Sequence, residues 1–308
     1  MSPTVGWTVF GWQGITARLP EDWHLAALGG DRKAGYLRLD DSERPRLEIK
    51  WSDASVDIDK ALDKYLQSLG RPARRGRRVE IDRTARVVSR RAMPKKRIRG
   101  FAWREKQAGR GVIWRCDICN RTVIVQVVGS EQEDLQSLAA RIIPSMQDHP
   151  EEGGETWGLY GFVCRIPEGF RLEKQRLMAG FLELEFSRGK RHLRVARWGM
   201  AEVALAGKSV SEWFEHLNRG RRDMQGSVSA DSRRGEAAAR LTGWRRRRGE
   251  PLLRLLQIGR RRPPEFAAFA WHCAASSRLY LVEEFWGREE SVLEEVVAGI
   301  PCHGEPAC

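Results

Sequence analysis

The chain has 308 residues, of which 41% are hydrophobic, so it can bury the cores of two ordinary domains and is not disordered throughout. Its 54 Lys and Arg outnumber its 41 Asp and Glu, which gives a formal net charge of +13. No stretch approaches the roughly 20 apolar residues that span a bilayer, and residues 1–20 do not resemble a secretory signal. Six cysteines in a chain of this size do not form a disulfide scaffold, so we expect a cytoplasmic protein with mostly reduced thiols.

The first half of the chain begins with predicted strands and continues into a helix. Residues 36–40 and 47–51 alternate apolar and polar side chains, which is typical of half-buried strands. Apolar residues at helical spacing follow over 58–69, and they predict a helix with Ser55 as its N-cap and Gly70 just past its end.

The rest of the first half predicts a hairpin, a central strand and a second helix. A tight turn at residues 116–121 leads into 122–128, which is apolar on both faces and therefore predicts a central strand. A late helix over 135–142 follows the sequence Ser-x-x-Glu at 130–133. Residues 147–156 are acidic, Gly-rich and without hydrophobic period, which indicates a linker.

The second half repeats the first in the same order. AGYLRL at 34–39 returns as AGFLEL at 179–184, and WRCDICNRTVIV at 114–125 returns as WHCAASSRLYLV at 271–282. Because such matches keep their order along the chain, we interpret them as a tandem duplication. The second half also predicts a capping box at 209–212, in which Ser and Glu side chains satisfy amide donors at the start of a helix.

Each half therefore predicts an antiparallel sheet covered by two helices. The predicted fold class is α+β, with two similar tandem domains at 1–150 and 151–308 related by a pseudo-twofold. Trp114 and Trp271 are expected on equivalent strands of the two copies.

A family resemblance follows from short motifs at both ends of each half. A Gly-aromatic strand runs into LPEDW at 19–23 or IPEGF at 166–170, and the last helix ends near Ile-Pro-Ser at 143–145 or Ile-Pro-Cys at 300–302. These features resemble the PsbP-like family and cover most of each half. The resemblance implies the same fold and a non-catalytic role in binding or assembly.

The pair Cys116-x-x-Cys119 is the clearest candidate for metal or redox chemistry. A structural zinc needs about four ligands, and Ser276 replaces the second cysteine in the other half. A thioredoxin-like site needs its first cysteine at a helix N-terminus, whereas this pair lies at a hairpin. Residues 302–308 contain two cysteines and a histidine that would be further ligands. The favoured interpretation is that Cys116 and Cys273 are buried packing residues, with no metal and no cofactor.

No catalytic motif is present in the sequence. There is no HExxH, no G-x-S-x-G and no complete P-loop. Residues 207–209 end like a P-loop, but Glu202 occupies the position of its first glycine. We therefore expect no catalytic residues, and an enzyme of unknown reaction is the third and weakest function class.

The positive charge is concentrated in two segments at equivalent positions. Residues 71–110 hold 16 Lys and Arg against 3 Asp and Glu, and residues 219–262 hold 14 against 4, so the rest of the chain is acidic. Concentrated positive charge attracts polyanions through sequence-independent phosphate contacts. The alternative is that these arginines pair with acidic residues of the same protein.

We expect these segments to bind nucleic acid or a ribonucleoprotein with low sequence specificity, and no membrane. Two linked modules gain avidity if both reach the same strand. The expected binding residues are Arg74, Arg75, Arg77, Arg78, Arg90, Arg91, Lys95, Lys96, Arg97, Arg99, Arg245, Arg246, Arg247, Arg248, Arg260, Arg261 and Arg262. The alternative function, implied by the PsbP-like resemblance, is a protein–protein adaptor or assembly factor.

Overall fold

The computed structural model describes residues 6–54, 56–69, 79–150, 153–219, 224–245, 265–286 and 290–302. The chain divides into two compact units, Met1–Val163 and Cys164–Pro306, called unit 1 and unit 2 below. Within the ranges described, no helix combines the length and apolar character needed to cross a membrane.

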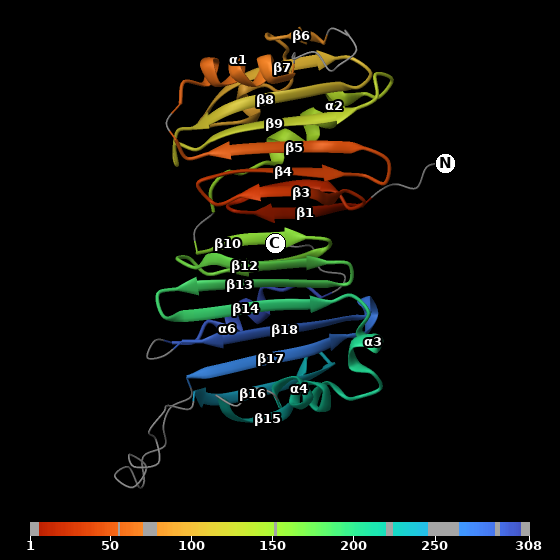
Figure 1. Cartoon of the computed structure of the whole chain (residues 1–308), viewed down its shortest axis with the longest axis vertical. Helices are drawn as coiled ribbons and strands as arrows, with labels where there is room; N and C mark the ends of the chain where they lie inside the picture. The colour runs from red at the N-terminus through yellow and green to blue at the C-terminus, as the bar shows by residue number, and fades with distance from the viewer. Residues whose placement is uncertain are drawn as a thin grey trace. The chain divides into compact units, whose positions relative to one another are not determined.

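Unit 1 is built on a seven-stranded antiparallel sheet in the order β3-β4-β5-β9-β8-β7-β6 (Figure 1). Its strands are β3 (His24–Gly30), β4 (Ala34–Asp40), β5 (Pro45–Ser52), β6 (Glu80–Asp82), β7 (Lys96–Arg104), β8 (Ala108–Cys116) and β9 (Thr122–Gly129). The prediction of a central strand is confirmed, since β9 lies in the middle of this order and is buried along most of its length.

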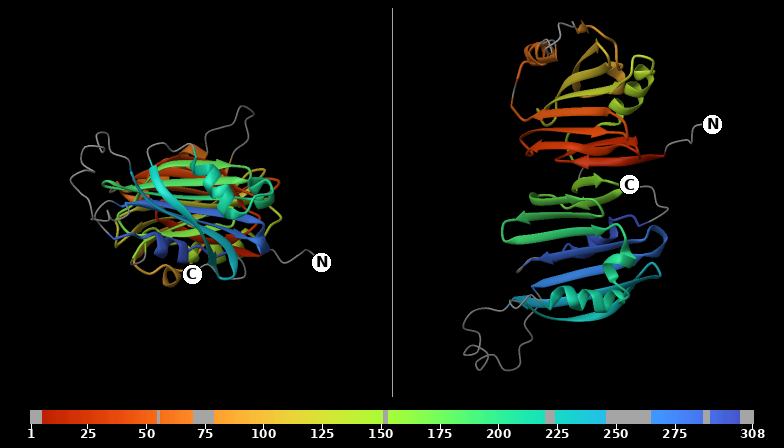
Figure 2. Two further views of the ribbon diagram at one scale, coloured as in Figure 1. Left: turned by 90° about the horizontal axis from the view of Figure 1, so that it is seen from below. Right: turned by 45° about the vertical axis from the view of Figure 1, so that its right-hand side comes forward.

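Two helices lie on opposite sides of this sheet (Figure 2). The predicted helix is confirmed as α1 (Ile58–Leu69), which packs Leu62, Tyr65 and Leu66 against Phe101 and Ile113. On the other side, α2 (Leu135–Ile142) buries its apolar residues and continues into the short 3-10 helix η2 (Ile143–Ser145). A further 3-10 helix, η1 (Arg90–Ala92), precedes β7.

The capping predicted for these two helices holds only in part. Ser55 and Gly70 lie outside the described residues. For α2, the N-cap is Asp134 and not Ser130, because the Asp134 side chain accepts the backbone N–H of Ser137. The interaction between residues 130 and 133 forms one turn earlier, where Ser130 N–H donates to Glu133.

A smaller sheet takes the order β11-β10-β1-β2, with β1 (Trp7–Trp12), β2 (Ile15–Pro20), β10 (Glu155–Leu159) and β11 (Phe162–Ile166). The turn between β1 and β2 places Gln13 at φ 52° and Gly14 at φ 79°. Two successive positive φ values define the tight hairpin turn whose twist matches its strands, and glycine adopts one of them at no steric cost. Trp12 and Trp157 meet edge to face at 5.0 Å in the core beneath.

Unit 2 contains a second seven-stranded antiparallel sheet, in the order β12-β13-β14-β18-β17-β16-β15. Its strands are β12 (Arg171–Met178), β13 (Phe181–Arg188), β14 (Arg191–Trp198), β15 (Met224–Arg233), β16 (Glu236–Arg245), β17 (Phe266–Cys273) and β18 (Arg278–Phe285). Its helices are α3 (Ala201–Leu205), α4 (Val210–Asn218), α6 (Leu293–Ala298) and the 3-10 helix η3 (Ala274–Ser276). The capping box at the start of α4 is confirmed, with Ser209 and Glu212 bonding reciprocally.

The two large sheets have the same strand order, counted along the chain. Trp114 on β8 and Trp271 on β17 occupy equivalent strands, and both are fully buried. This agreement supports the tandem duplication, which stays a prediction.

The predicted α+β class with two helices per domain is wrong. Strands hold 51% of the described residues and helices 19%, in three antiparallel sheets of four, seven and seven strands. The difference arises because segments whose sequences do not alternate between apolar and polar residues still pair as β-strands. The ten-residue strands β15 and β16 pair along their whole length, although the sequence there is small, polar and basic. The mostly-β class replaces the predicted α+β class.

Candidate polyanion-binding cleft

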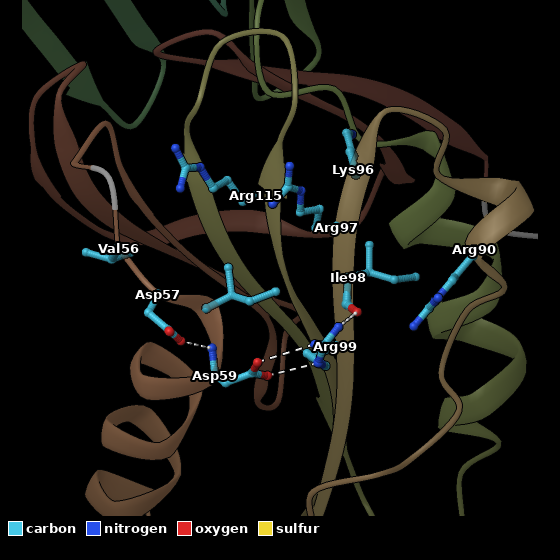
Figure 3. A pocket seen from close by; sticks show the side chains of 10 residues that line it. Val56, Asp57, Asp59, Arg90, Lys96, Arg97, Ile98, Arg99 and Arg115 are labelled. Atoms are coloured by element: carbon cyan, nitrogen blue, oxygen red, sulfur yellow. Dashed lines mark hydrogen bonds and ion pairs between the residues drawn. The ribbon is translucent and has the colours of Figure 1, made fainter.

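A cleft of about 760 Å³ opens on unit 1 between the start of α1 and strand β7 (Figure 3). It is lined by Val56, Asp57, Ile58, Asp59, Arg90, Lys96, Arg97, Ile98, Arg99 and Arg115. Five of these side chains are cationic and two are carboxylates, so the lining is positive.

The strand register brings the arginines together. Arg97 on β7 is the direct cross-strand partner of Arg115 on β8, and Arg99 follows two residues along β7 on the same face. The same face of the sheet is covered by α1, because Phe101 on β7 and Ile113 on β8 pack against this helix. Like charges directly opposite one another destabilise a sheet, so the Arg97–Arg115 pair is an arrangement that packing alone does not favour.

The two carboxylates of the cleft are already engaged. Asp57 accepts the backbone N–H groups of Asp59 and Lys60 at 2.9 and 3.0 Å, and the bond from Lys60 lowers the pKa of Asp57 most. Asp59 pairs with Arg99 at 2.9 Å. In the described part of the chain, Arg90 and Arg115 have no acidic partner. Their charge is available to a ligand.

The predicted residues fall into three groups in the structure. Arg90, Lys96, Arg97 and Arg99 line the cleft, and Arg91 and Lys95 are exposed near them in sequence. Arg97 also pairs with Asp117 at 3.1 Å, so part of this segment does pair within the protein. The described residues do not include Arg74, Arg75, Arg77, Arg78, Arg246, Arg247, Arg248, Arg260, Arg261 and Arg262. Arg245 is the last residue of β16, and its side chain is not described.

Lys96 belongs to a different environment from the other cations. Its side chain is only 11% exposed, and its ammonium donates to the carbonyl of Met146 at 2.8 Å. The same ammonium lies 4.9 Å from the centre of the Trp114 ring. Burial lowers the pKa of Lys96. The Lys96 ammonium therefore makes its contacts mainly inside unit 1 and contributes little to the charge of the surface.

Sequence reasoning missed Arg115 as a cleft residue. Arg115 lies outside the charge-dense segment, at the end of β8. The turn predicted at 116–121 fixes β8 only against β9, whereas the register of β8 against β7 is set by the connection between Arg104 and Ala108, which the sequence did not predict. Without the β7–β8 pairing, nothing in the sequence places Arg115 beside Arg97.

Unit 1 also holds a sulfur-containing cluster on the opposite face of β8, since Arg115 and Cys116 are consecutive. Cys116, Cys119, Asp148 and His149 bring their ligand atoms within 4.8 Å of one another. The burial predicted for Cys116 and Cys273 is confirmed, at 1% and 0% exposure. Asp148 and His149 were missed because they lie in the segment interpreted as a linker.

Comparison with protein-family models, with characterised proteins and with solved structures found no match to this chain. The resemblance to the PsbP-like family therefore stays a prediction, and the function is argued from the site alone.

Proposed function

We propose that this protein is a non-catalytic binding protein that engages a polyanion, nucleic acid or a ribonucleoprotein, through the cleft between α1 and β7. The observation that carries the proposal is the cross-strand pair of Arg97 and Arg115. Like charges directly opposite one another on paired strands cost stability, and a bound anion would offset that cost beyond what the contact of Arg97 with Asp117 supplies. Arginine suits a phosphate in this position because its planar fork donates two parallel hydrogen bonds.

The surroundings of this pair extend the positive surface. Arg90 on η1 lines the same cleft, and Arg91 and Lys95 are exposed on the chain that leads into β7. No base-reading motif accompanies them, so low sequence specificity is expected. The cytoplasmic location stays part of the proposal. It agrees with the five free cysteines in the described part of the chain.

The test is binding of labelled single-stranded and duplex oligonucleotides at about 50 and 200 mM salt, a range over which phosphate contacts lose decades of affinity. The variant Arg90→Ala/Arg97→Ala/Arg115→Ala removes three cleft arginines. We expect it to bind at least about tenfold more weakly and with a shallower salt dependence, because each lost phosphate contact reduces the slope by roughly 0.7 to 0.9.

The matched control is Arg18→Ala/Arg104→Ala/Arg141→Ala, which removes the same charge from exposed arginines that do not line the cleft. We expect this control to bind much more tightly than the cleft variant. Absence of binding by the wild-type protein at the lower salt would contradict the proposal. Equal weakening in both variants would also contradict it, because net charge and not the cleft would then govern binding.

A further inference from the structure

Four side chains of metal-ligating type converge at the end of β8 in unit 1. Cys116 ends the strand, Cys119 lies in the turn that follows, and Asp148 and His149 come from the segment after η2. Their ligand atoms all lie within 4.8 Å of one another. Among the described residues, no second group of three or more such side chains gathers in this way. We propose that this cluster binds one structural zinc ion.

The ligand atoms are spaced closely enough to surround one metal ion. Sγ of Cys116 lies 3.6 Å from Nδ1 of His149. Zinc bonds of about 2.3 Å to sulfur and 2.0–2.1 Å to nitrogen, at a tetrahedral angle, place the two atoms about 3.6 Å apart. Oδ1 of Asp148 lies 2.9 Å from the same Nδ1, where about 3.3 Å is needed, so a shift of a few tenths of an ångström brings this pair to the required spacing.

The turn between the cysteines brings backbone donors to both sulfurs. The backbone N–H of Ile118 donates to Sγ of Cys116 at 3.4 Å, and the backbone of Arg121 bonds to the Cys119 thiol. Asn120 follows Cys119 and adopts φ 60°, a left-handed conformation that Asn tolerates, where the chain turns back toward β9. Burial raises the pKa of the Cys119 thiol to about 11, so zinc binds by displacing the thiol proton.

A second layer of contacts holds the carboxylate and balances the charge. The indole of Trp114 donates to Oδ2 of Asp148 at 2.6 Å, which leaves Oδ1 facing His149. Two thiolates and a carboxylate give a zinc complex with one net negative charge. The ammonium of Lys96, 4.0 Å from Oδ1 of Asp148, neutralises that charge. Metal ligands are typically oriented by such outer contacts.

The donor set selects the metal. Thiolate and imidazole ligands suit zinc and disfavour magnesium and calcium, which prefer oxygen. Four protein ligands make a closed centre, which is typical of structural and not catalytic zinc. Cys119 is exposed and offers an entry path for the ion. In unit 2, Ser276 occupies the position equivalent to Cys119, so the site is specific to unit 1.

The experiment measures zinc in the full chain, purified under reducing conditions and dialysed against buffer with trace zinc. We expect about one zinc per chain in the wild type and in the control Cys302→Ser, which removes a thiol outside the cluster. The variants Cys119→Ser and His149→Ala should lose the metal. Replacement by cobalt should give the visible bands of a tetrahedral centre and a thiolate charge-transfer band in the near ultraviolet, both absent in Cys119→Ser.

Thermal unfolding distinguishes a variant that has lost the zinc site from one that has simply misfolded. A chelator should lower the melting temperature of the wild type and leave that of Cys119→Ser unchanged, because only the former loses a ligand of the folded state. The proposal is overturned if reduced wild-type protein takes up no stoichiometric zinc, or if Cys119→Ser holds as much as the wild type. A Cys116–Cys119 disulfide in the reduced preparation would overturn it as well.

Discussion

The indole Nε1–H of Trp114 donates a hydrogen bond of 2.6 Å to Oδ2 of Asp148, and both side chains are buried. The bond joins β8 to the segment after α2, 34 residues further along the chain. A buried carboxylate needs such partners, since an unsatisfied one costs far more than a neutral group. Trp114 is therefore both a core residue of unit 1 and the positioning residue for Asp148.

Replacement of Trp114 by Phe should weaken zinc binding 10- to 100-fold, the usual effect of removing an outer-layer contact. Loss of the donor should also cost roughly 1–3 kcal/mol of folding free energy. Zinc affinity is measured by chelator competition and stability by urea unfolding. The matched control is Trp51→Phe, which loses a similar indole hydrogen bond, to the carbonyl of Asp31 at 2.8 Å. If Trp51→Phe weakens zinc binding equally, Trp114 does not act through Asp148.

In unit 2, Arg194 bridges two buried carboxylates. It bonds to Glu183 at 2.7 Å and to Glu283 at 2.6 Å, and both glutamates are about 95% buried. Arg194→Met removes the shared cation and should cost about 3–5 kcal/mol in urea unfolding, because buried carboxylates lose their compensating charge. Lys174→Ala breaks an exposed pair with Glu185 and should cost less than about 1 kcal/mol. Equal losses in the two variants would contradict the bridging role.

Gly100 on β7 lets the chain before η1 approach the strand. A Cβ at this position would lie 2.1 Å from the carbonyl oxygen of Ala85. Gly100→Ala should therefore cost about 1–3 kcal/mol or more and displace the segment that carries Arg90. At Gly29 a Cβ would meet nothing within 4 Å. Gly29→Ala should change stability by less than about 1 kcal/mol, and a larger loss there would undermine the steric argument.

Asp134 should make unfolding depend on pH in the acid range. The hydrogen bonds from the side chain and the backbone of Ser137 lower the pKa of Asp134 below its ordinary value of 3.8. A lowered pKa in the folded state means that the stabilisation is complete above the unfolded pKa and is lost as pH falls through the folded one. Asp134→Ala should thus lower the urea midpoint at pH 7, and its difference from the wild type should narrow below about pH 3. A constant difference at all pH values would show that the carboxylate charge plays no part.

Features that depend on neighbouring residues were predicted well. The helix over 58–69 and the capping box of Ser209 and Glu212 follow from local periodicity and local hydrogen bonds. The turn at 116–121 joins β8 to β9 as expected. The fold class failed because strand pairing depends on partners elsewhere, and the small, polar segments of β15 and β16 carry no period of their own.

The sequence by itself determined the charge-dense segments, the buried cysteine of β8 and the positions of the main helices and a few strands, since these depend on residue type and near neighbours. Only the tertiary structure decided the two sites. Antiparallel pairing set Arg115 opposite Arg97, and the return of the chain after α2 set Asp148 and His149 beside Cys116. Both juxtapositions join residues at least 18 positions apart in sequence. The physical reason is that burial of the whole sheet fixes the strand register and the path of the chain after α2. No local sequence pattern encodes either of them.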